Sequence, residues 1–472
     1  MALALALTLA LLQAWHGQGG ALGHRGESTY VYGNIDMYAY YFVDLLVGVP
    51  NPQRVSVIID TGSSLCGFPC DKCHHCGQHL EPQFRFGDSA TASPLSCDSR
   101  ECEGACEDGV CSYVQSYAEG SSVRGFFFKD SAMLADALRP NKPVITTLGC
   151  HTDERKLFYT QWVNGIMGLA PRREAAGTTT VLASLFRQAR ASNFSMCLSE
   201  WGGILTVGGV NVDYHTSGIS WLPMEPLDYY RVRPQQMRLE RGSGGAAAEL
   251  AALSGASFGS AIVDSGTTYA DFPRSVARLI FAALREVCAS GACAAELRSG
   301  AGEKDVDCWK LLGDPDAGPV LFPALHLAFA GGAVVSWPAS QYLRANPQSG
   351  LWCPAFESGA EGRMVLGLSF LLGKDFIFDL QGRRLGVANA SCPERKRAPD
   401  EARFERGLSW ATSDADVENR KHMLMAISVV LLMLSAALFT YACFGWYCPL
   451  PVVPSWELSA REGVAGSLLP TE

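Results

Sequence analysis

A five-residue string that occurs twice constrains the fold of this chain more than any other feature of its sequence. Asp-Thr-Gly-Ser-Ser begins at Asp60 and Asp-Ser-Gly-Thr-Thr begins at Asp264, each directly after an apolar run. Two apolar residues and a glycine follow each string at nearly the same distance: Gly168 lies 108 residues after Asp60, and Gly367 lies 103 residues after Asp264. Average residue usage gives this coincidence less than about one chance in a hundred. The repeat therefore predicts two lobes built on the same plan.

The composition of the chain predicts a mostly β fold around this repeat. Its 48 glycines and 24 prolines are scattered along the sequence, as expected for many short strands joined by turns. We place an N-terminal lobe at 23–222, with a cysteine-rich insert at 66–111, and a C-terminal lobe at 223–392. A stretch rich in Gly, Ala and Ser at 241–260 predicts a flexible surface loop.

Apolar segments near the two ends of the chain predict a single-pass membrane protein. Residues 1–22 contain an unbroken apolar run followed by small residues, which predicts a signal peptide. Residues 423–447 contain no charged side chain and are long enough to cross a bilayer as a helix. We therefore expect a type I protein with a lumenal stalk at 393–422 and a cytosolic tail at 448–472. The net charge of -9 provides no basic face, so nucleic acid is not expected as a partner.

The cysteine content agrees with a lumenal or extracellular position. Of the 17 cysteines, 15 precede the predicted membrane span. An oxidising compartment favours disulfides over the alternative that the Cys-x-x-Cys-x-x-Cys string at 70–76 binds a metal together with His74 and His75. The odd number leaves at least one thiol unpaired, and the sequence does not say which one. Asn193 and Asn389 each begin an N-x-Ser string and are candidate sites of N-glycosylation.

The two repeated aspartates are candidate catalytic residues for peptide hydrolysis. Hydrolysis by water requires a base that takes a proton from the water and an acid that protonates the carbonyl oxygen. Asp60 and Asp264 supply both when they share one proton, because like charges close together do not both ionise readily. This chemistry calls for no cofactor and no metal. Six neighbouring residues are expected to support the two loops: Gly62 and Gly266 by letting the backbone turn tightly, Thr61 and Ser265 by bonding across the interface between lobes, and Ser63 and Thr267 by donating to the carboxylates.

The residues around these strings resemble the pepsin-like aspartic proteases over about 40–390, nearly the whole predicted lumenal region. The resemblance includes Gly165–Ala170 and Phe376–Asp379. It implies a bilobal fold of double-ψ β-barrels and a hairpin flap that covers the cleft. Residues Ser116–Ser121 are similar to that flap, which puts Tyr117 in the place of the tyrosine that contacts substrate.

The resemblance extends to a narrower group within these proteases. The cysteine-rich insert resembles that of nepenthesin-type enzymes, while Gln115–Ser121 and Gly149–His151 resemble the plasmepsin V-type secretory-pathway proteases of apicomplexans. This implies cleavage of secretory and exported proteins after Arg-x-Leu motifs. It puts Glu119, with Gly120 beside it, and Gln161 at the positions that bind the arginine. Independently, a carboxylate on a flap is a suitable partner for a guanidinium group.

The sequence departs from the family patterns in three features. Ala118 stands where the plasmepsin V-type flap carries a cysteine, and Cys66 is an additional thiol near the first catalytic loop. The tryptophan that pepsin-like enzymes usually carry shortly after the first motif is absent from Cys66–Phe68. These differences concern fine specificity and redox behaviour and leave the reaction class unchanged.

Two other functions stay open beside a processing protease. One is a secretase-like sheddase of membrane proteins, which would share the type I anchor, and the other is an inactive peptide-binding module. Replacing Asp60 by Asn or Ala is expected to abolish turnover in both proteases and to change nothing in a binding module. The resemblance favours a membrane of the secretory pathway, the endoplasmic reticulum more than the Golgi, with polypeptides as partners.

Overall fold

The computed structural model describes residues 26–171, 179–226, 229–241, 248–252, 258–302, 306–313 and 318–397, all within one compact unit. The predicted signal peptide, transmembrane helix and cytosolic tail, and most of the predicted stalk, lie outside these residues. In the described part of the chain, no helix has both the length and the apolar character that crossing a bilayer requires.

The first half of the chain is built mainly from strands, as its composition predicts. The elements up to residue 223 are β1 Glu27–Asn34, β2 Tyr40–Val47, β3 Gln53–Asp60, β4 Cys66–Pro69, the 3-10 helix η1 Phe86–Asp88, β5 Ser93–Pro94, β6 Ala105–Glu107, β7 Val110–Ser116, β8 Ser122–Leu134, β9 Val144–Arg155, α2 Leu157–Thr160, β10 Gly165–Gly168, α3 Val181–Ala189, β11 Asn193–Leu198, β12 Gly203–Val207, the 3-10 helix η3 Val212–Tyr214 and β13 Ser220–Pro223. Strand β3 shows why these segments form strands. Its β-branched residues Val55, Val57 and Ile59 are fully buried on one face, as suits a pleated surface.

The second half repeats this strand-rich construction and adds one long helix. Its elements are β14 Glu225–Pro226, β15 Tyr230–Val232, β16 Pro234–Arg241, β17 Ala248–Ala252, β18 Ala261–Val263, β19 Ala270–Pro273, α4 Arg274–Ala289, β20 Ala295–Arg298, β21 Cys308–Leu311, β22 Ala324–Phe329, β23 Val334–Trp337, α5 Ala339–Tyr342, β24 Leu343–Ala345, β25 Trp352–Pro354, β26 Phe356–Gly359, β27 Met364–Leu366, α6 Leu368–Leu371, β28 Lys374–Asp379 and β29 Arg384–Asn389. Helix α4 buries Val276, Ile280, Leu284 and Val287, the spacing of one helical face.

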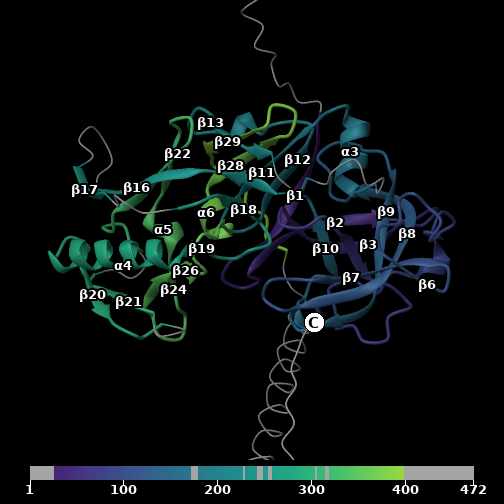
Figure 1. The fold of residues 1–472 in the computed structure, drawn as a ribbon, viewed down its shortest axis with the longest axis horizontal. Coiled ribbons are helices and arrows are strands. Elements are labelled where there is room, and N and C mark those ends of the chain that lie inside the picture. The colour runs from purple at the N-terminus through teal and green to yellow at the C-terminus, as the bar shows by residue number, and fades with distance from the viewer. Residues whose placement is uncertain are drawn as a thin grey trace, which may run out of the picture. The chain divides into compact units, whose positions relative to one another are not determined.

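One large sheet runs through both halves of the chain. Its strand order is β13-β29-β28-β11-β12-β1-β2-β3-β10-β4-β9-β8-β7-β6, so the C-terminal strands β28 and β29 lie between β11 and β13. Figure 1 shows the flap strands β7 and β8 and the strands β3, β9 and β10 gathered on one side of β1 and β12, with β16, β17, β20 and α4 on the other side. Two sheets of four strands and one of six complete the second half. The predicted mostly β architecture is therefore present.

The repeat in the sequence is also a repeat in strand pairing. Strand β3 runs parallel to β10, with Asp60 opposite Gly168. Strand β18 runs parallel to β27 in the same way, with Val263 opposite Leu366. Each apolar-apolar-Gly string thus lies beside the strand that carries the repeated aspartate.

The prediction of a loop at 241–260 was wrong for part of that stretch. Strand β17 pairs antiparallel with β16, with Arg238 opposite Ala252 and Arg241 opposite Ala248. Backbone pairing along β16 here outweighs the low strand propensity of the alanines and the glutamate of β17.

Fourteen cysteines of the described chain form seven disulfides, as the prediction of an oxidising compartment requires. The pairs are Cys70–Cys150, Cys73–Cys76, Cys97–Cys106, Cys102–Cys111, Cys197–Cys392, Cys288–Cys293 and Cys308–Cys353. The string at 70–76 uses all three of its sulfurs in disulfides, so the alternative that they act as thiolate ligands of a metal was wrong. Cys66 is the free cysteine among the described residues, and it is buried.

Candidate active site

Equivalent backbone positions hold the two aspartates. The backbone N–H of Leu169 donates to the Asp60 carbonyl at 2.7 Å, just beyond the end of β10. The backbone N–H of Asp264 donates to the carbonyl of Leu366, the last residue of β27, at 3.1 Å. Each aspartate therefore lies at the carboxyl end of a strand whose position is fixed by its parallel neighbour.

Thr61 and Ser265 connect the two aspartate loops through four hydrogen bonds. The Thr61 hydroxyl donates to the Val263 carbonyl at 2.9 Å and accepts from the Ser265 N–H at 2.9 Å. The Ser265 hydroxyl donates to the Ile59 carbonyl at 2.7 Å and accepts from the Thr61 N–H at 3.1 Å. Both side chains are fully buried, so these bonds form in a region of low dielectric. They hold the two aspartates in a fixed mutual position.

Gly62 and Gly266 are required by close approach rather than by backbone conformation. Both lie in turns, as the sequence suggested, but neither has a positive φ that would itself require glycine. A Cβ at Gly62 would lie 2.6 Å from Oδ1 and 2.7 Å from Oδ2 of Asp264. A Cβ at Gly266 would overlap the carboxylate of Asp60 in the same way. Each loop therefore passes directly over the other loop's aspartate, and a side chain at either glycine would push the pair apart.

The two carboxyl groups have matching hydrogen-bond partners. Asp60 Oδ1 accepts from the Gly62 N–H at 2.8 Å, and its Oδ2 accepts from the Ser63 hydroxyl. Asp264 Oδ1 accepts from the Gly266 N–H at 2.8 Å, and its Oδ2 accepts from the Thr267 hydroxyl at 2.7 Å.

The environments of the two acids differ in burial. Asp60 is buried with 4% of its surface exposed, whereas Asp264 is partly exposed. Burial raises the pKa of Asp60 well above its ordinary value, and the charge of Asp264 raises it further. The hydrogen bond from Ser63 lowers this pKa but does not outweigh the other two effects. The pair is therefore suited to keep one proton.

The flap predicted at Ser116–Ser121 is the turn of the β7–β8 hairpin. Ser116 lies opposite Ser122, and the Tyr117 N–H donates to the Ser121 carbonyl at 3.0 Å. The Tyr117 ring packs against Phe158, with ring centroids 4.9 Å apart. Its hydroxyl is buried, and burial together with the charge of Asp60 raises the pKa of Tyr117, so the phenol stays protonated. The structure thus brings Tyr117 toward the aspartates.

Glu119, Gly120 and Gln161 lie on two segments beside Tyr117. Glu119 is exposed at the turn of the hairpin and accepts a hydrogen bond from the Ser121 hydroxyl. Gly120 has a φ of +88°, a conformation that L side chains rarely adopt. Gln161 follows α2, and its side-chain amide donates to the Val163 carbonyl at 3.1 Å. No hydrogen bond between Glu119 and Gln161 side chains occurs among the described residues.

The two predicted glycosylation sites differ in exposure. The side chain of Asn193, at the start of β11, is partly buried and donates to the Gly209 carbonyl at 3.0 Å. Asn389, at the end of β29, is exposed. The surroundings of Asn389 leave more room for a glycan.

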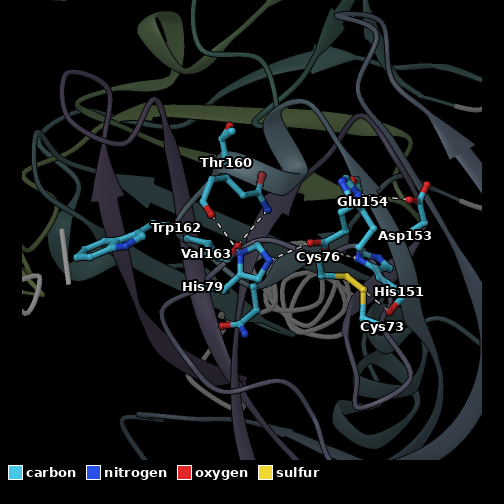
Figure 2. A network of polar contacts seen from close by, with 12 residues as sticks. Cys73, Cys76, His79, His151, Asp153, Glu154, Thr160, Trp162 and Val163 are labelled. Atoms are coloured by element: carbon cyan, nitrogen blue, oxygen red, sulfur yellow. Dashed lines mark hydrogen bonds and ion pairs between the residues drawn. A yellow bond between two sulfur atoms is a disulfide. The ribbon is translucent and has the colours of Figure 1, made fainter. Parts of the chain in front are cut away.

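Sequence reasoning missed a buried network of two histidines and a glutamate near Gln161. Glu154 Oε1 contacts His151 Nδ1 at 2.9 Å, and its Oε2 contacts His79 Nε2 at 2.9 Å. The second nitrogen of His79, Nδ1, faces the Gln161 carbonyl at 3.1 Å. Figure 2 shows His79 between Glu154 and the segment that carries Thr160 and Val163.

A β-bulge in β9 explains why the sequence did not reveal this network. Residues three apart on a regular strand point to opposite faces, so His151 and Glu154 would not be expected to meet. Arg124 of β8 pairs with Asp153 and Gly125 pairs with His151, which leaves Thr152 as an extra residue. The bulge turns His151 and Glu154 toward each other.

His151 also fills the space beside the stretch Cys66–Phe68, in which the tryptophan of pepsin-like enzymes is absent. A Cβ at Gly67 would lie 2.6 Å from His151 Nε2, so the imidazole takes up the space beside Gly67. The ring of His151 also packs near Tyr113 and Phe158, with centroids 6.0 Å and 6.2 Å away. A larger residue at Gly67 would displace His151 from Glu154.

Comparison with known sequences agrees with this geometry. A sequence model of the eukaryotic aspartyl proteases matches residues 40–390, well over half of the chain. The chain belongs to the pepsin-like aspartyl protease family. Aspartic protease 5 of Toxoplasma gondii is 33% identical over 81% of this chain and 40% of its own length. Plasmepsin V of Plasmodium falciparum is 27% identical over 77% of this chain and 73% of its own, and nepenthesin-2 of Nepenthes gracilis is 24% identical over 75% and 78%.

Family membership confirms the predicted reaction class. Pepsin-like aspartyl proteases are endopeptidases, so the prediction of an aspartic-type endopeptidase is confirmed at the level of the family. This chain covers less than half the length of the Toxoplasma relative. The similarity to that relative and to plasmepsin V agrees with the narrower resemblance expected from the flap and the residues at 149–151.

Proposed function

We propose that this chain is a membrane-anchored endopeptidase of the secretory pathway that cleaves secretory and exported proteins after Arg-x-Leu motifs. The observation that carries the proposal is the opposed pair Asp60 and Asp264, with matched hydrogen-bond partners and a proton favoured on the pair. The seven disulfides support a lumenal position. The membrane anchor is inferred from the predicted signal peptide and transmembrane segment, and the preference for the endoplasmic reticulum over the Golgi from the resemblance to plasmepsin V-type proteases.

The two aspartates account for hydrolysis as a water-activation reaction. The ionised carboxyl group accepts a proton from water as the water oxygen bonds to the scissile carbonyl carbon, and the protonated group donates its proton to the carbonyl oxygen. When the tetrahedral intermediate breaks down, the C–N bond breaks and the carboxyl group that took a proton from water gives it to the leaving nitrogen. The other carboxylate takes a proton back from a hydroxyl of the intermediate as the carbonyl of the product acid forms, which restores the starting state of the pair. The Tyr117 hydroxyl, which stays protonated, is a donor from the flap side of the same cleft.

Glu119 and Gln161 account for selection of arginine. Ser121 donates to Oε1 of Glu119, and the exposed carboxylate is available to a guanidinium group from a substrate beneath the flap. Gln161 uses its amide N–H₂ on the Val163 carbonyl, so its amide oxygen is the atom that would accept from the same guanidinium. A planar guanidinium matches two such acceptors, and an ammonium does not.

The test is cleavage of three peptides that differ at one position, Arg-x-Leu, Lys-x-Leu and Ala-x-Leu, by the purified full-length chain. We expect kcat/KM for the arginine peptide to exceed that for the lysine peptide about tenfold or more, as for a charge-assisted pair. Glu119→Gln should remove most of that preference. Glu296→Gln, at an exposed glutamate in β20, should leave it unchanged.

Each other outcome has a distinct meaning. Equal cutting of all three peptides would refute the roles of Glu119 and Gln161 and keep the protease. A preference for sequences next to a membrane span, whatever the residue at that position, would favour the sheddase. Absence of cutting in a random peptide library would favour the inactive binding module.

A further inference from the structure

His79 is held between two groups that only accept hydrogen bonds. Its Nε2 lies 2.9 Å from Glu154 Oε2, and its Nδ1 lies 3.1 Å from the backbone carbonyl oxygen of Gln161. A neutral imidazole has one donor nitrogen, whereas an imidazolium has two. Both contacts are satisfied when His79 is an imidazolium and Glu154 is a carboxylate.

The state of Glu154 agrees with this assignment. Burial by itself would raise the pKa of Glu154, but the hydrogen bonds from His151 and His79 outweigh burial and lower it. The side chains of His79 and Glu154 are 1% and 0% exposed. An ionised group at such a depth requires a partner of opposite charge, and His79 is in direct contact with it.

His79 joins two segments that are distant in sequence. His79 follows the Cys73–Cys76 disulfide in the cysteine-rich insert, and that insert is tied to β9 by Cys70–Cys150. The second segment is 156–164, which contains α2 and Gln161 and is contacted by His79 at the Gln161 carbonyl. One further hydrogen bond reinforces the contact, because the Leu80 N–H donates to the Trp162 carbonyl at 2.6 Å.

The supported segment also faces the flap. Phe158, in α2, packs against the ring of Tyr117, and Gln161 lies at the end of the same helix. The bond from His79 reaches the backbone of Gln161 and not its side chain, so it fixes where that residue sits without occupying its amide group.

We propose that His79 is a positioning residue for substrate selection, which holds Gln161 in place through its backbone carbonyl while the Glu154 carboxylate holds His79. This inference rests on the proposed role of Gln161 in binding arginine. His79 does not touch substrate or the aspartates. The cysteine-rich insert thereby supports the segment that packs against the flap.

The experiment compares His79→Gln with His74→Gln in the full-length chain. The substitution at His79 keeps a side-chain donor and loses the charge, while His74 is an exposed histidine of the same insert and serves as the matched control. The double variant His79→Gln/Glu154→Gln removes both charges, so that no unpaired carboxylate stays buried if the single variant fails to fold. The readouts are kcat/KM for the Arg-x-Leu and Ala-x-Leu peptides and hydrogen exchange of the amides at 157–163.

We expect the His79 variants to lose about tenfold or more in selectivity for arginine over alanine, a size typical of a misplaced binding group. The loss should appear as a higher KM for the arginine peptide, with kcat/KM for the alanine peptide unchanged. The amides at 157–163 should exchange faster than in the His74→Gln control. A folded His79→Gln or double variant with unchanged selectivity and unchanged exchange overturns the inference.

The two proposals fail in different ways. A wild-type chain that does not distinguish arginine from alanine refutes the proposed specificity. In that case the exchange data decide the positioning role: faster exchange at 157–163 in His79→Gln alone supports it, and exchange equal to the control refutes it.

Discussion

The substitution Thr61→Val tests whether the hydrogen bonds between the aspartate loops hold the two halves of the site together. Valine has nearly the shape of threonine and lacks its hydroxyl. In the structure that hydroxyl accepts from the Ser265 N–H and donates to the Val263 carbonyl, both at 2.9 Å. The site is fully buried, so water cannot replace either partner without a rearrangement.

The size of the effect follows from the two groups left without partners. A buried polar group that loses its hydrogen bond costs about 1–3 kcal/mol, so two such groups predict a loss of about 2–6 kcal/mol in the free energy of unfolding. This is large for one conservative change, because most point substitutions cost about 0.5–3 kcal/mol. Activity should fall as well, since the same bonds fix the distance between Asp60 and Asp264.

The assay is urea unfolding followed by tryptophan fluorescence with the disulfides intact. The midpoint should fall in Thr61→Val with little change in slope. Thr160→Val is the matched control, because the Thr160 hydroxyl is exposed and bonds only to carbonyls of its own turn, Lys156 at 3.3 Å and Leu157 at 3.5 Å. We expect the control to stay within about 0.5 kcal/mol of the wild type. A Thr61→Val chain as stable and as active as this control would refute the reasoning.

Three further predictions follow from other parts of the structure. Gly62→Ala should reduce kcat/KM by about a hundredfold or more, since a misplaced reacting group has this effect, whereas Gly87→Ala, where a Cβ meets nothing within 4 Å, should change it little; equal kinetics of the two would contradict the close-approach argument. The pKa of Glu154 lies below its ordinary value of 4.5, so its ionised carboxylate contributes stability that is fully present above pH 4.5 and is lost as the pH falls through the lowered pKa of the folded chain. Glu154→Gln should therefore destabilise the chain at neutral pH and progressively less in acid, as measured by urea midpoints across pH. A destabilisation that is the same at every pH would contradict this prediction. Asn389→Gln should remove a glycosidase-sensitive mobility shift that Asn193→Gln leaves in place, because Asn389 is exposed and Asn193 is bonded to Gly209, and the reverse result would show that exposure does not decide the site.

The repeated strings carried most of the information about the fold. Their spacing predicted the duplicated plan, and the structure realises it as two parallel pairs, β3 with β10 and β18 with β27. The flap was also predictable, because the string at Ser116–Ser121 is similar to the flap of pepsin-like proteases. Each of these features depends on residues close together in sequence, or on a motif that occurs twice.

Features that depend on strand register were not predictable from the sequence. The bulge at Thr152 brings His151 and Glu154 together, and no residue type in that stretch predicts a bulge. His79 was not singled out because its partners lie more than seventy residues away, at Glu154 and Gln161. The reason for Gly62 also became clear only when the opposite aspartate was seen beside it.

For the cysteines too, one feature was predictable from the sequence and another was not. Their odd number predicted an unpaired thiol, and the structure identifies it as Cys66. The partners could not be read from the sequence, since many pairings fit so many cysteines. Cys70 illustrates the point, because it bonds to Cys150 across β4 and β9 and not to a neighbour in its own string.

The central claim is that Asp60 and Asp264 together hydrolyse peptides, and the most direct test is turnover of a random peptide library by three variants. Asp60→Asn and Asp264→Asn each remove one acid with little change in shape, and Asp98→Asn changes an exposed aspartate in the cysteine-rich insert as a control. We predict that each of the first two lowers kcat by about a thousandfold or more, as for the loss of a general acid or base, and that the control retains wild-type turnover. Turnover that persists at the control level in either Asp60→Asn or Asp264→Asn, in a folded chain, would contradict the account.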